Sequence, residues 1–169
     1  MFEYMKKNEY KESGKHCREI IRDVQKDLKN TFNFNIHLIG SCKSRLMMRN
    51  GNGPYDFDYS LEIIKDKKDL EFDPKKIREI VFNSFQKFAE KHGFSKMENS
   101  TRVIKLKSHS NKIQNHIEYF MEVAIIKKLK KTNNINTIIF DKENERYIWN
   151  EEEDISNLKG KLLMPNTPF

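Results

Sequence analysis

The sequence predicts an α+β fold: a mixed, mostly antiparallel sheet of about five strands, with two main helices packed on one face. Two segments repeat apolar residues at the spacing of an amphipathic helix. Several others alternate apolar and polar residues, which is typical of strands with one buried face. The length of 169 residues suits one domain with a hydrophobic core, so we treat residues 1–169 as a single unit.

The first half of the chain is expected to contain a polar arm or short helix, an amphipathic helix, a strand, a turn region and a second strand. Apolar residues recur every three or four positions in the amphipathic helix, and Cys17 lies on its apolar side. The turn region ends in the glycine-rich run RNGNGP, which follows a stretch that could make one or two helical turns. In order, these segments are residues 1–14, 15–29, 32–39, 42–54 and 55–64.

The second half begins with the clearest helix in the sequence. Asp73 is a good N-cap, Pro74 suits the first helical turn, and an apolar stripe runs to about Gly93. Two strands, a hairpin and a short C-terminal helix that begins in an acidic run are expected to follow. These elements are residues 101–108, 116–126, 136–150 and 151–162, and a tail runs to residue 169.

The composition narrows the class of partner and the cellular compartment. A formal charge of +7 favours an anionic partner such as nucleic acid, although a high net charge can equally serve to keep a protein soluble. Cys17 and Cys42 lack the spacing of a disulfide framework or a zinc site. No apolar run has the length needed to span a bilayer, so we expect a soluble, cytoplasmic protein with no membrane partner.

Two predicted strands carry acidic residues on one face and apolar residues on the other. Asp56 and Asp58 stand at positions i and i+2, so their side chains leave the strand on the same side. The later strand repeats this pattern with Glu118 and Glu122. A face this acidic is not ordinary core, so we expect the acids to line a cleft on the side of the sheet away from the helices.

Several common catalytic motifs are absent from the sequence. A phosphate-binding P-loop fails because His37 and Cys42 stand where its two glycines belong, ahead of Lys43-Ser44. There is no HExxH or paired CxxC metal motif, and no serine lies in a nucleophile-elbow sequence. His37 itself is expected to be a packed or solvent-facing strand residue. The chemistry that remains is a site for hard cations.

Carboxylates on one face of a strand can share divalent metal ions. With a third carboxylate from a neighbouring strand, Asp56 and Asp58 would form an oxygen-rich site suited to two Mg²⁺ ions, which Mn²⁺ could replace. Such ions hold a nucleoside triphosphate during phosphoryl or nucleotidyl transfer. Gly40 would let the backbone approach the phosphates closely, and the Ser41 hydroxyl could hydrogen-bond to them.

The segment GSCKSRLMMRNGNGPYDFDYSLEI, which starts at Gly40, resembles the signature of the DNA polymerase beta-like nucleotidyltransferase superfamily. Members have Gly-Ser or Gly-Gly at a strand-to-helix turn, then an acidic-hydrophobic-acidic strand, then a third acid on another strand. The segment is similar to bacterial and oligonucleotide-synthase-like members with a long insertion between the motifs. The resemblance implies a nucleotidyltransferase fold in which Gly40 and Ser41 contact the triphosphate, while Asp56 and Asp58 bind Mg²⁺.

The third acid is where this sequence departs from the family pattern. Many relatives read hydrophobic-Asp-hydrophobic at that point, whereas this chain offers Glu118 and Glu122. We prefer Glu122 as the third catalytic and metal-binding residue, because the VAII that follows it resembles the end of the family's third active-site strand. If Ala124 holds the position instead, the third acid is missing.

Four basic residues are candidates for contact with the triphosphate or substrate: Lys43, Arg45, Lys105 and Lys107. The resemblance implies Mg²⁺-dependent transfer of a nucleoside monophosphate from an NTP to a hydroxyl of RNA, a nucleotide, a protein or a small molecule. The chain has little space for the family's helical domain, so a protein partner or self-association could complete the site. The alternative is a catalytically degenerate module that binds nucleotide, RNA or a protein partner.

Overall fold

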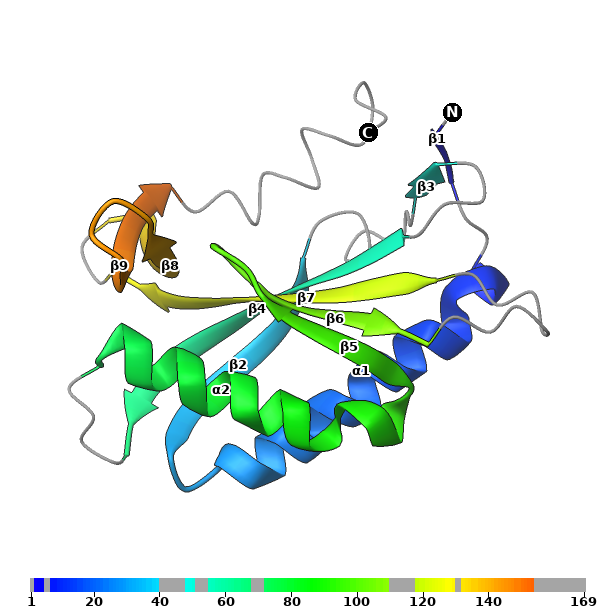
Figure 1. The fold of residues 1–169 in the computed structure, drawn as a ribbon, viewed down its shortest axis with the longest axis horizontal. Coiled ribbons are helices and arrows are strands. Elements are labelled where there is room, and N and C mark those ends of the chain that lie inside the picture. The colour runs from blue at the N-terminus through cyan, green and yellow to red at the C-terminus, as the bar shows by residue number, and fades with distance from the viewer. Residues whose placement is uncertain are drawn as a thin grey trace.

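The computed structural model describes seven stretches of the chain, and they contain two long helices and a strongly twisted sheet (Figure 1). These stretches are residues 2–4, 7–39, 48–50, 55–67, 72–109, 118–129 and 132–153. Gly40, Ser41, Cys42, Lys43 and Arg45 lie outside them, as does everything after residue 153.

The helices are α1 (Lys7–Leu28) and α2 (Pro74–Ala89), and a single 3-10 turn, η1 (Glu90–His92), extends the second. The strands are β1 (Phe2–Tyr4), β2 (Phe32–Ile39), β3 (Met48–Asn50), β4 (Tyr55–Asp66), β5 (Phe94–Asn99), β6 (Ile104–Ser108), β7 (Tyr119–Lys128), β8 (Asn134–Asp141) and β9 (Arg146–Glu153).

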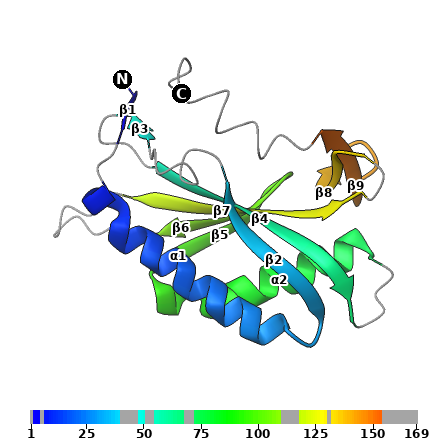
Figure 2. The same ribbon diagram turned by 180° about the vertical axis from the view of Figure 1, so that it is seen from behind.

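The main sheet of the described residues has seven strands in the order β2-β4-β7-β6-β5, and the β8-β9 hairpin pairs with the end of β7. β4 and β7 run parallel, and the other described pairs are antiparallel. The two views of the ribbon place α1 and α2 on the same side of the sheet (Figures 1 and 2). The predicted α+β class, the mixed sheet and the one-sided helices are confirmed.

The helices lie on one face of the sheet because they and the strands carry matching apolar stripes. On β4, the residues at odd positions from Tyr55 to Ile63 are buried, while Asp56 is exposed and Asp58 is half-buried. The acidic face of β4 is therefore the face turned away from the helices. The buried side chains of the helices include Cys17, Ile20, Val24 and Leu28 on α1, and Ile77, Val81 and Phe85 on α2.

α2 begins and ends at the residues that the sequence indicates. The Asp73 carboxylate accepts hydrogen bonds from the backbone N–H groups of Lys75 and Lys76 at 2.9 and 3.4 Å, which satisfies two of the unpaired donors at a helix start. After the η1 turn, Gly93 adopts φ 86°, a conformation that an L side chain rarely takes. No described helix is long and apolar enough to cross a membrane.

Several elements differ from the predictions. The main sheet has seven described strands rather than about five, and β1 and β3, which were not predicted as strands, pair with each other in a separate two-stranded sheet. α1 begins at Lys7 rather than Lys15, and its polar first turns are anchored by a buried 2.5 Å hydrogen bond between the Ser13 and Tyr55 hydroxyls. β5 was not predicted, because its burial hardly alternates and Phe94 is its one fully buried residue. The predicted C-terminal helix is wrong at its start, since residues 151–153 end strand β9. The remainder of that predicted helix and the tail lie outside the described residues.

Candidate active site

Asp58 and Glu122 face each other across the parallel strands β4 and β7. The register pairs Asp58 with Glu122, and it pairs Asp56 with Phe120 and Ser60 with Ala124. Side chains at paired positions leave the sheet on the same face, and on β4 this is the face away from the helices. Asp56 lies two residues before Asp58 on that face, so the strands bring three carboxylates to one region.

Lys105 extends this row onto strand β6. It pairs with Glu122 in the antiparallel β6-β7 register, and its Nζ lies 3.6 Å from Glu122 Oε1. The same Nζ lies 4.2 Å from the centre of the Phe120 ring, which also attracts a cation. Lys105 is therefore held at the acids from two sides.

Glu118 lies apart from this row. It immediately precedes β7 and pairs with Lys107, with 3.8 Å between Lys107 Nζ and Glu118 Oε2. Of the two glutamates considered for the third acid, the structure thus places Glu122 beside Asp58. Ala124 lies two residues further along β7, opposite Ser60.

The carboxylates oppose one another's ionisation. Burial raises the pKa of Glu122, and the charge of Asp58 and a hydrogen bond with it act in the same direction, while Lys105 lowers that pKa. Partial desolvation of its carboxylate and the charge of Glu122 likewise raise the pKa of Asp56, although much of the residue is exposed, and Lys105 again acts in the opposite direction. Like charges held this close together are stabilised by a cation, so the electrostatics of the site favour binding of one.

The donor set suits Mg²⁺ by its chemistry, because carboxylate oxygens are the ligands that this ion prefers. Asp56, Asp58 and Glu122 would hold it. In the described parts of the chain, however, no three His, Cys, Asp or Glu side chains are gathered as a metal-binding group, and Glu122 is engaged by Lys105. Binding of a metal would therefore require these side chains to turn toward a common point.

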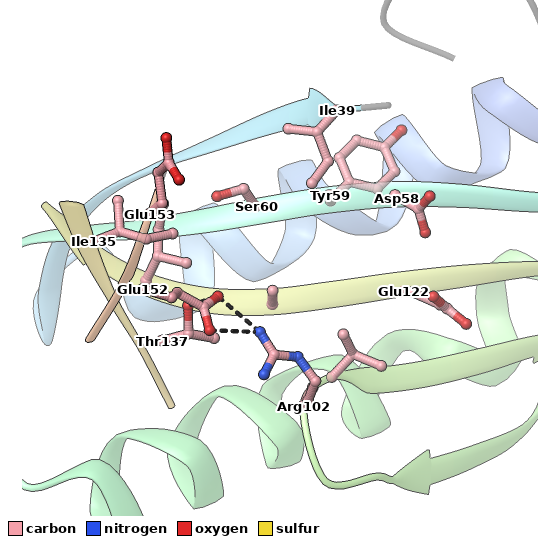
Figure 3. A pocket seen from close by; sticks show the side chains of 13 residues that line it. Ile39, Asp58, Tyr59, Ser60, Arg102, Glu122, Ile135, Thr137, Glu152 and Glu153 are labelled. Carbon is pink, nitrogen blue, oxygen red and sulfur yellow. Dashed lines mark hydrogen bonds and ion pairs between the residues drawn. The ribbon is translucent and has the colours of Figure 1, made fainter. Parts of the chain in front are cut away.

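A pocket of about 240 Å³ opens beside the acids (Figure 3). Asp58 and Glu122 line one end, and Ser60 and Ala124 line the pocket next to them. At the other end Arg102 is bound to Glu152, beside Thr137 (Figure 3). The pocket therefore joins the carboxylate row to a polar cluster on the β8-β9 hairpin.

The described part of β2 ends immediately before the Gly-Ser motif. Gly40 and Ser41 lie outside the described residues, but Ile39, the last residue of β2, pairs with Asp58. The chain thus leaves β2 beside Asp58 and at the edge of the pocket, since Ile39 also lines it. Lys43 and Arg45 follow in the same undescribed stretch.

The sequence did not indicate Arg102 as a site residue. It lies at the start of the predicted strand 101–108, and nothing in the run TRVIKLKS separates it from a surface arginine. Its partner Glu152 lies in the acidic run that was predicted to open a helix. The two meet because β9 pairs with β8, and β8 with the end of β7.

No protein-family model matches the chain, and no curated protein matches it in sequence. Solved structures do resemble it. CdnG, a CD-NTase of Bradyrhizobium diazoefficiens solved in complex with GTP, has 13% sequence identity and a TM-score of 0.66 over 93% of this chain and 42% of its own. Apo DncV of Vibrio cholerae has 14% sequence identity and a TM-score of 0.53, over 95% of this chain and 42% of its own.

The chain spans less than half the length of these two solved structures, so the likeness concerns their shared part. Both are members of the DNA polymerase beta-like nucleotidyltransferase superfamily. At this level of identity the likeness bears on architecture: the chain has the nucleotidyltransferase fold of that superfamily.

Proposed function

We propose that this protein is a Mg²⁺-dependent nucleotidyltransferase that moves a nucleoside monophosphate from an NTP to a hydroxyl acceptor. The observation that carries the proposal is the pairing of Asp58 with Glu122 across β4 and β7, with Asp56 two residues away, at the end of a pocket. Such an arrangement of acids on a nucleotidyltransferase fold supports metal-assisted nucleotidyl transfer.

Each residue of the site has a proposed role. Asp56, Asp58 and Glu122 would hold the metal, which when bound would offset triphosphate charge and stabilise the oxygens between which the nucleotidyl group moves. Lys105 favours ionised carboxylates, because its charge lowers the pKa of Asp56 and Glu122. Lys105 could also contact the triphosphate.

Gly40 and Ser41 would bind the triphosphate where β2 ends beside Asp58, with Lys43 and Arg45 following. The acceptor class remains broad in this proposal: RNA, a nucleotide, a protein or a small molecule. The formal charge of +7 supports an anionic acceptor. A protein partner or a second copy of the chain would supply any surface that the acceptor needs beyond this domain, and we place the activity in the cytoplasm.

A second candidate function is a module that binds nucleotide, RNA or a protein partner without turnover. Two observations favour it: Lys105 engages Glu122, and the described acids are not gathered as a metal-binding group. If Lys105 stays paired with Glu122, less negative charge is left at the site for a metal ion to neutralise.

The decisive experiment incubates the full-length protein with each α-labelled NTP and Mg²⁺, and follows pyrophosphate release and transfer of label. The transferase predicts metal-dependent release that is lost in Asp56→Asn and Asp58→Asn. Glu98→Gln is the matched control, because Glu98 is an exposed acid of β5, at the far end of the same cross-strand row. Nucleotide binding without release in the unaltered protein would favour the binding module. Release that persists in both aspartate variants would overturn the assignment of the site.

A further inference from the structure

We propose that the outer edge of strand β2 is a self-association surface, on which two copies of the chain pair their β2 strands antiparallel about a two-fold axis. β2 forms one edge of the main sheet (Figure 2), and in the part of the chain that the structure describes it pairs with β4 alone. The inference goes beyond the proposed transferase activity and does not depend on it. It names a surface and its partner, a second copy of this chain.

The β2 edge lacks the charges that keep sheet edges from pairing. Its sequence, FNFNIHLI, contains no Lys, Arg, Asp, Glu or Pro, in a chain of which 34% of the residues are charged. The other edge strands of the described sheet differ from it, because β5 carries Lys96 and Glu98, and β9 ends in three glutamates. Charges and prolines at an edge discourage pairing with another strand. Among the described edges, β2 is therefore the one best suited to such pairing.

β2 is also long and regular enough to pair with a second strand. It has eight residues, whereas strands usually have about five or six. A single shift in its register with β4 falls between Asn33 and Phe34, and the extra residue there is Ile64 of β4. The backbone of β2 itself therefore carries no bulge that would turn its outer N–H and C=O groups away from a partner.

The alternation of polar and apolar residues along β2 determines the register of the pair. A pair centred on Asn35 places Asn35 opposite its own copy and Asn33 opposite His37, and all three side chains are exposed. The apolar residues between them then face apolar residues on the other side of the sheet, so that every cross-strand pair is of like character. A pair centred on Ile36 would instead set Asn33 opposite Ile39, a polar residue against an apolar one.

Self-pairing would also cover apolar surface that a single copy leaves in contact with water. Phe34, Ile36 and Leu38 lie on the helix side of the sheet, opposite buried residues of β4, but they are themselves only half-buried. In the pair, the same row of the second copy continues this row across the axis. Removal of this apolar surface from water favours association.

The net charge of the chain limits where two copies can meet. Each copy has a formal charge of +7, so contact between charged surfaces would bring like charges together. A two-fold axis sets the same patch of both copies against itself, and the uncharged β2 edge is a patch that does not repel its own copy. Because an axis perpendicular to the sheet keeps its faces on the same side, the carboxylate rows of both copies would open on one face of a continuous sheet.

The test measures the mass of the full-length protein by sedimentation velocity over a range of micromolar concentrations. The unaltered protein should form a dimer. Asn35→Lys sets two lysines against each other at the axis and should weaken the dimer about tenfold or more. Mixing Asn35→Lys with Asn35→Asp should restore association, because opposite charges then meet there. Ser95→Lys, at an exposed position of the β5 edge, is the matched control and should leave the dimer unchanged.

Four outcomes would overturn the inference: a monomer at every concentration, a dimer that Asn35→Lys leaves as stable as before, a dimer that Ser95→Lys weakens equally, or a mixture of the two charged variants that associates no better than each alone. Asn35 is exposed, so the thermal unfolding of both variants should match that of the unaltered protein. Because sedimentation needs no NTP, loss of the proposed transferase activity would leave the inference intact, and a monomeric protein would leave the assignment of the carboxylate site intact.

Discussion

Asp58 and Glu122 oppose each other in the register of the parallel strands β4 and β7, while Glu118 lies before β7 in an ion pair with Lys107. Two glutamates that look alike in the sequence therefore have different surroundings. Only Glu122 lies opposite Asp58, and this separates the contributions that we expect the two glutamates to make to the proposed catalysis.

Glu122→Gln should lower kcat for pyrophosphate release by about 10²-fold or more, the loss expected for a preorganised charged group at a reacting centre. Glu118→Gln is the matched control, since it removes the same charge from a residue that pairs with Lys107 instead of lying opposite Asp58, and it should stay within about threefold of the unaltered enzyme. Steady-state kinetics with saturating NTP and Mg²⁺ measures both. A larger loss in Glu118→Gln than in Glu122→Gln would show that Glu118, and not Glu122, is the third acid.

Glu122→Gln should also stabilise the fold at neutral pH when no divalent metal is present. Burial and Asp58 raise the pKa of Glu122 above its unfolded value. A carboxyl group with a raised folded pKa contributes stability below its unfolded pKa, and that contribution is lost as the pH rises through the folded pKa. At pH 7 to 8 the ionised Glu122 therefore costs stability, which Glu122→Gln restores.

Thermal unfolding in EDTA between about pH 4 and pH 8 tests this linkage. The melting temperature of Glu122→Gln should exceed that of the unaltered protein by a few degrees at the upper end, because ~1 kcal/mol moves Tm by roughly 2–4 °C in a chain of this size. The difference should shrink as the pH falls toward about 4.3, the ordinary pKa of glutamate. A Glu122→Gln protein that melts lower at pH 7.5 would mean that the ion pair with Lys105 outweighs the repulsion.

Lys105 should compete with the metal. Its Nζ lies 3.6 Å from Glu122 Oε1, so Lys105→Gln removes a charge that partly neutralises the acids. The rise in Tm produced by a fixed Mg²⁺ concentration should then be larger in the variant, because tighter binding to the native state gives more stabilisation. Lys107→Gln controls for charge, since Lys107 pairs with Glu118. An Mg²⁺ effect that is smaller in Lys105→Gln would indicate that Lys105 supports the metal site.

The sequence predicts the strands that carry the acids because each has one face in the core. On β4 the residues that alternate with Asp56 and Asp58 are buried, and β2 has the predicted bounds Phe32–Ile39. Apolar and polar residues alternate in such a strand because successive side chains point to opposite faces of the sheet, and one face is buried. It also places Glu122 on the acidic face, although the pairing of β7 with β4 that brings it to Asp58 depends on the topology and cannot be read from either strand alone.

The parts that the sequence does not predict depend on contacts between distant residues. The first turns of α1 look like a polar arm until Ser13 is paired with Tyr55, and β5 has too little burial to alternate. Arg102 and Glu152 are 50 residues apart and meet because β8 pairs with β7 and β9 pairs with β8. Neither residue carries a local pattern that separates it from an ordinary surface charge.

Arg78 should be the residue of the pocket's supporting structure that is least tolerant of substitution. Its side chain is wholly buried, and it donates to Asn99 Oδ1 at 2.8 Å and to the carbonyls of Ser100, Val103 and Ile138. Arg78→Lys keeps the charge, but one ammonium group cannot reach acceptors arranged around a guanidinium. Leaving buried acceptors unpaired costs about 1–3 kcal/mol each, so we expect a loss of roughly 3 kcal/mol in the free energy of unfolding.

Urea unfolding of Arg78→Lys measures this loss, and Arg146→Lys at the exposed hairpin turn should remain within about 0.5 kcal/mol of the unaltered protein, as surface substitutions usually do. A variant that keeps full stability would show that the turn between β5 and β6 is held by its other contacts, chiefly the 2.8 Å bond from the Ser100 hydroxyl to the Val103 carbonyl.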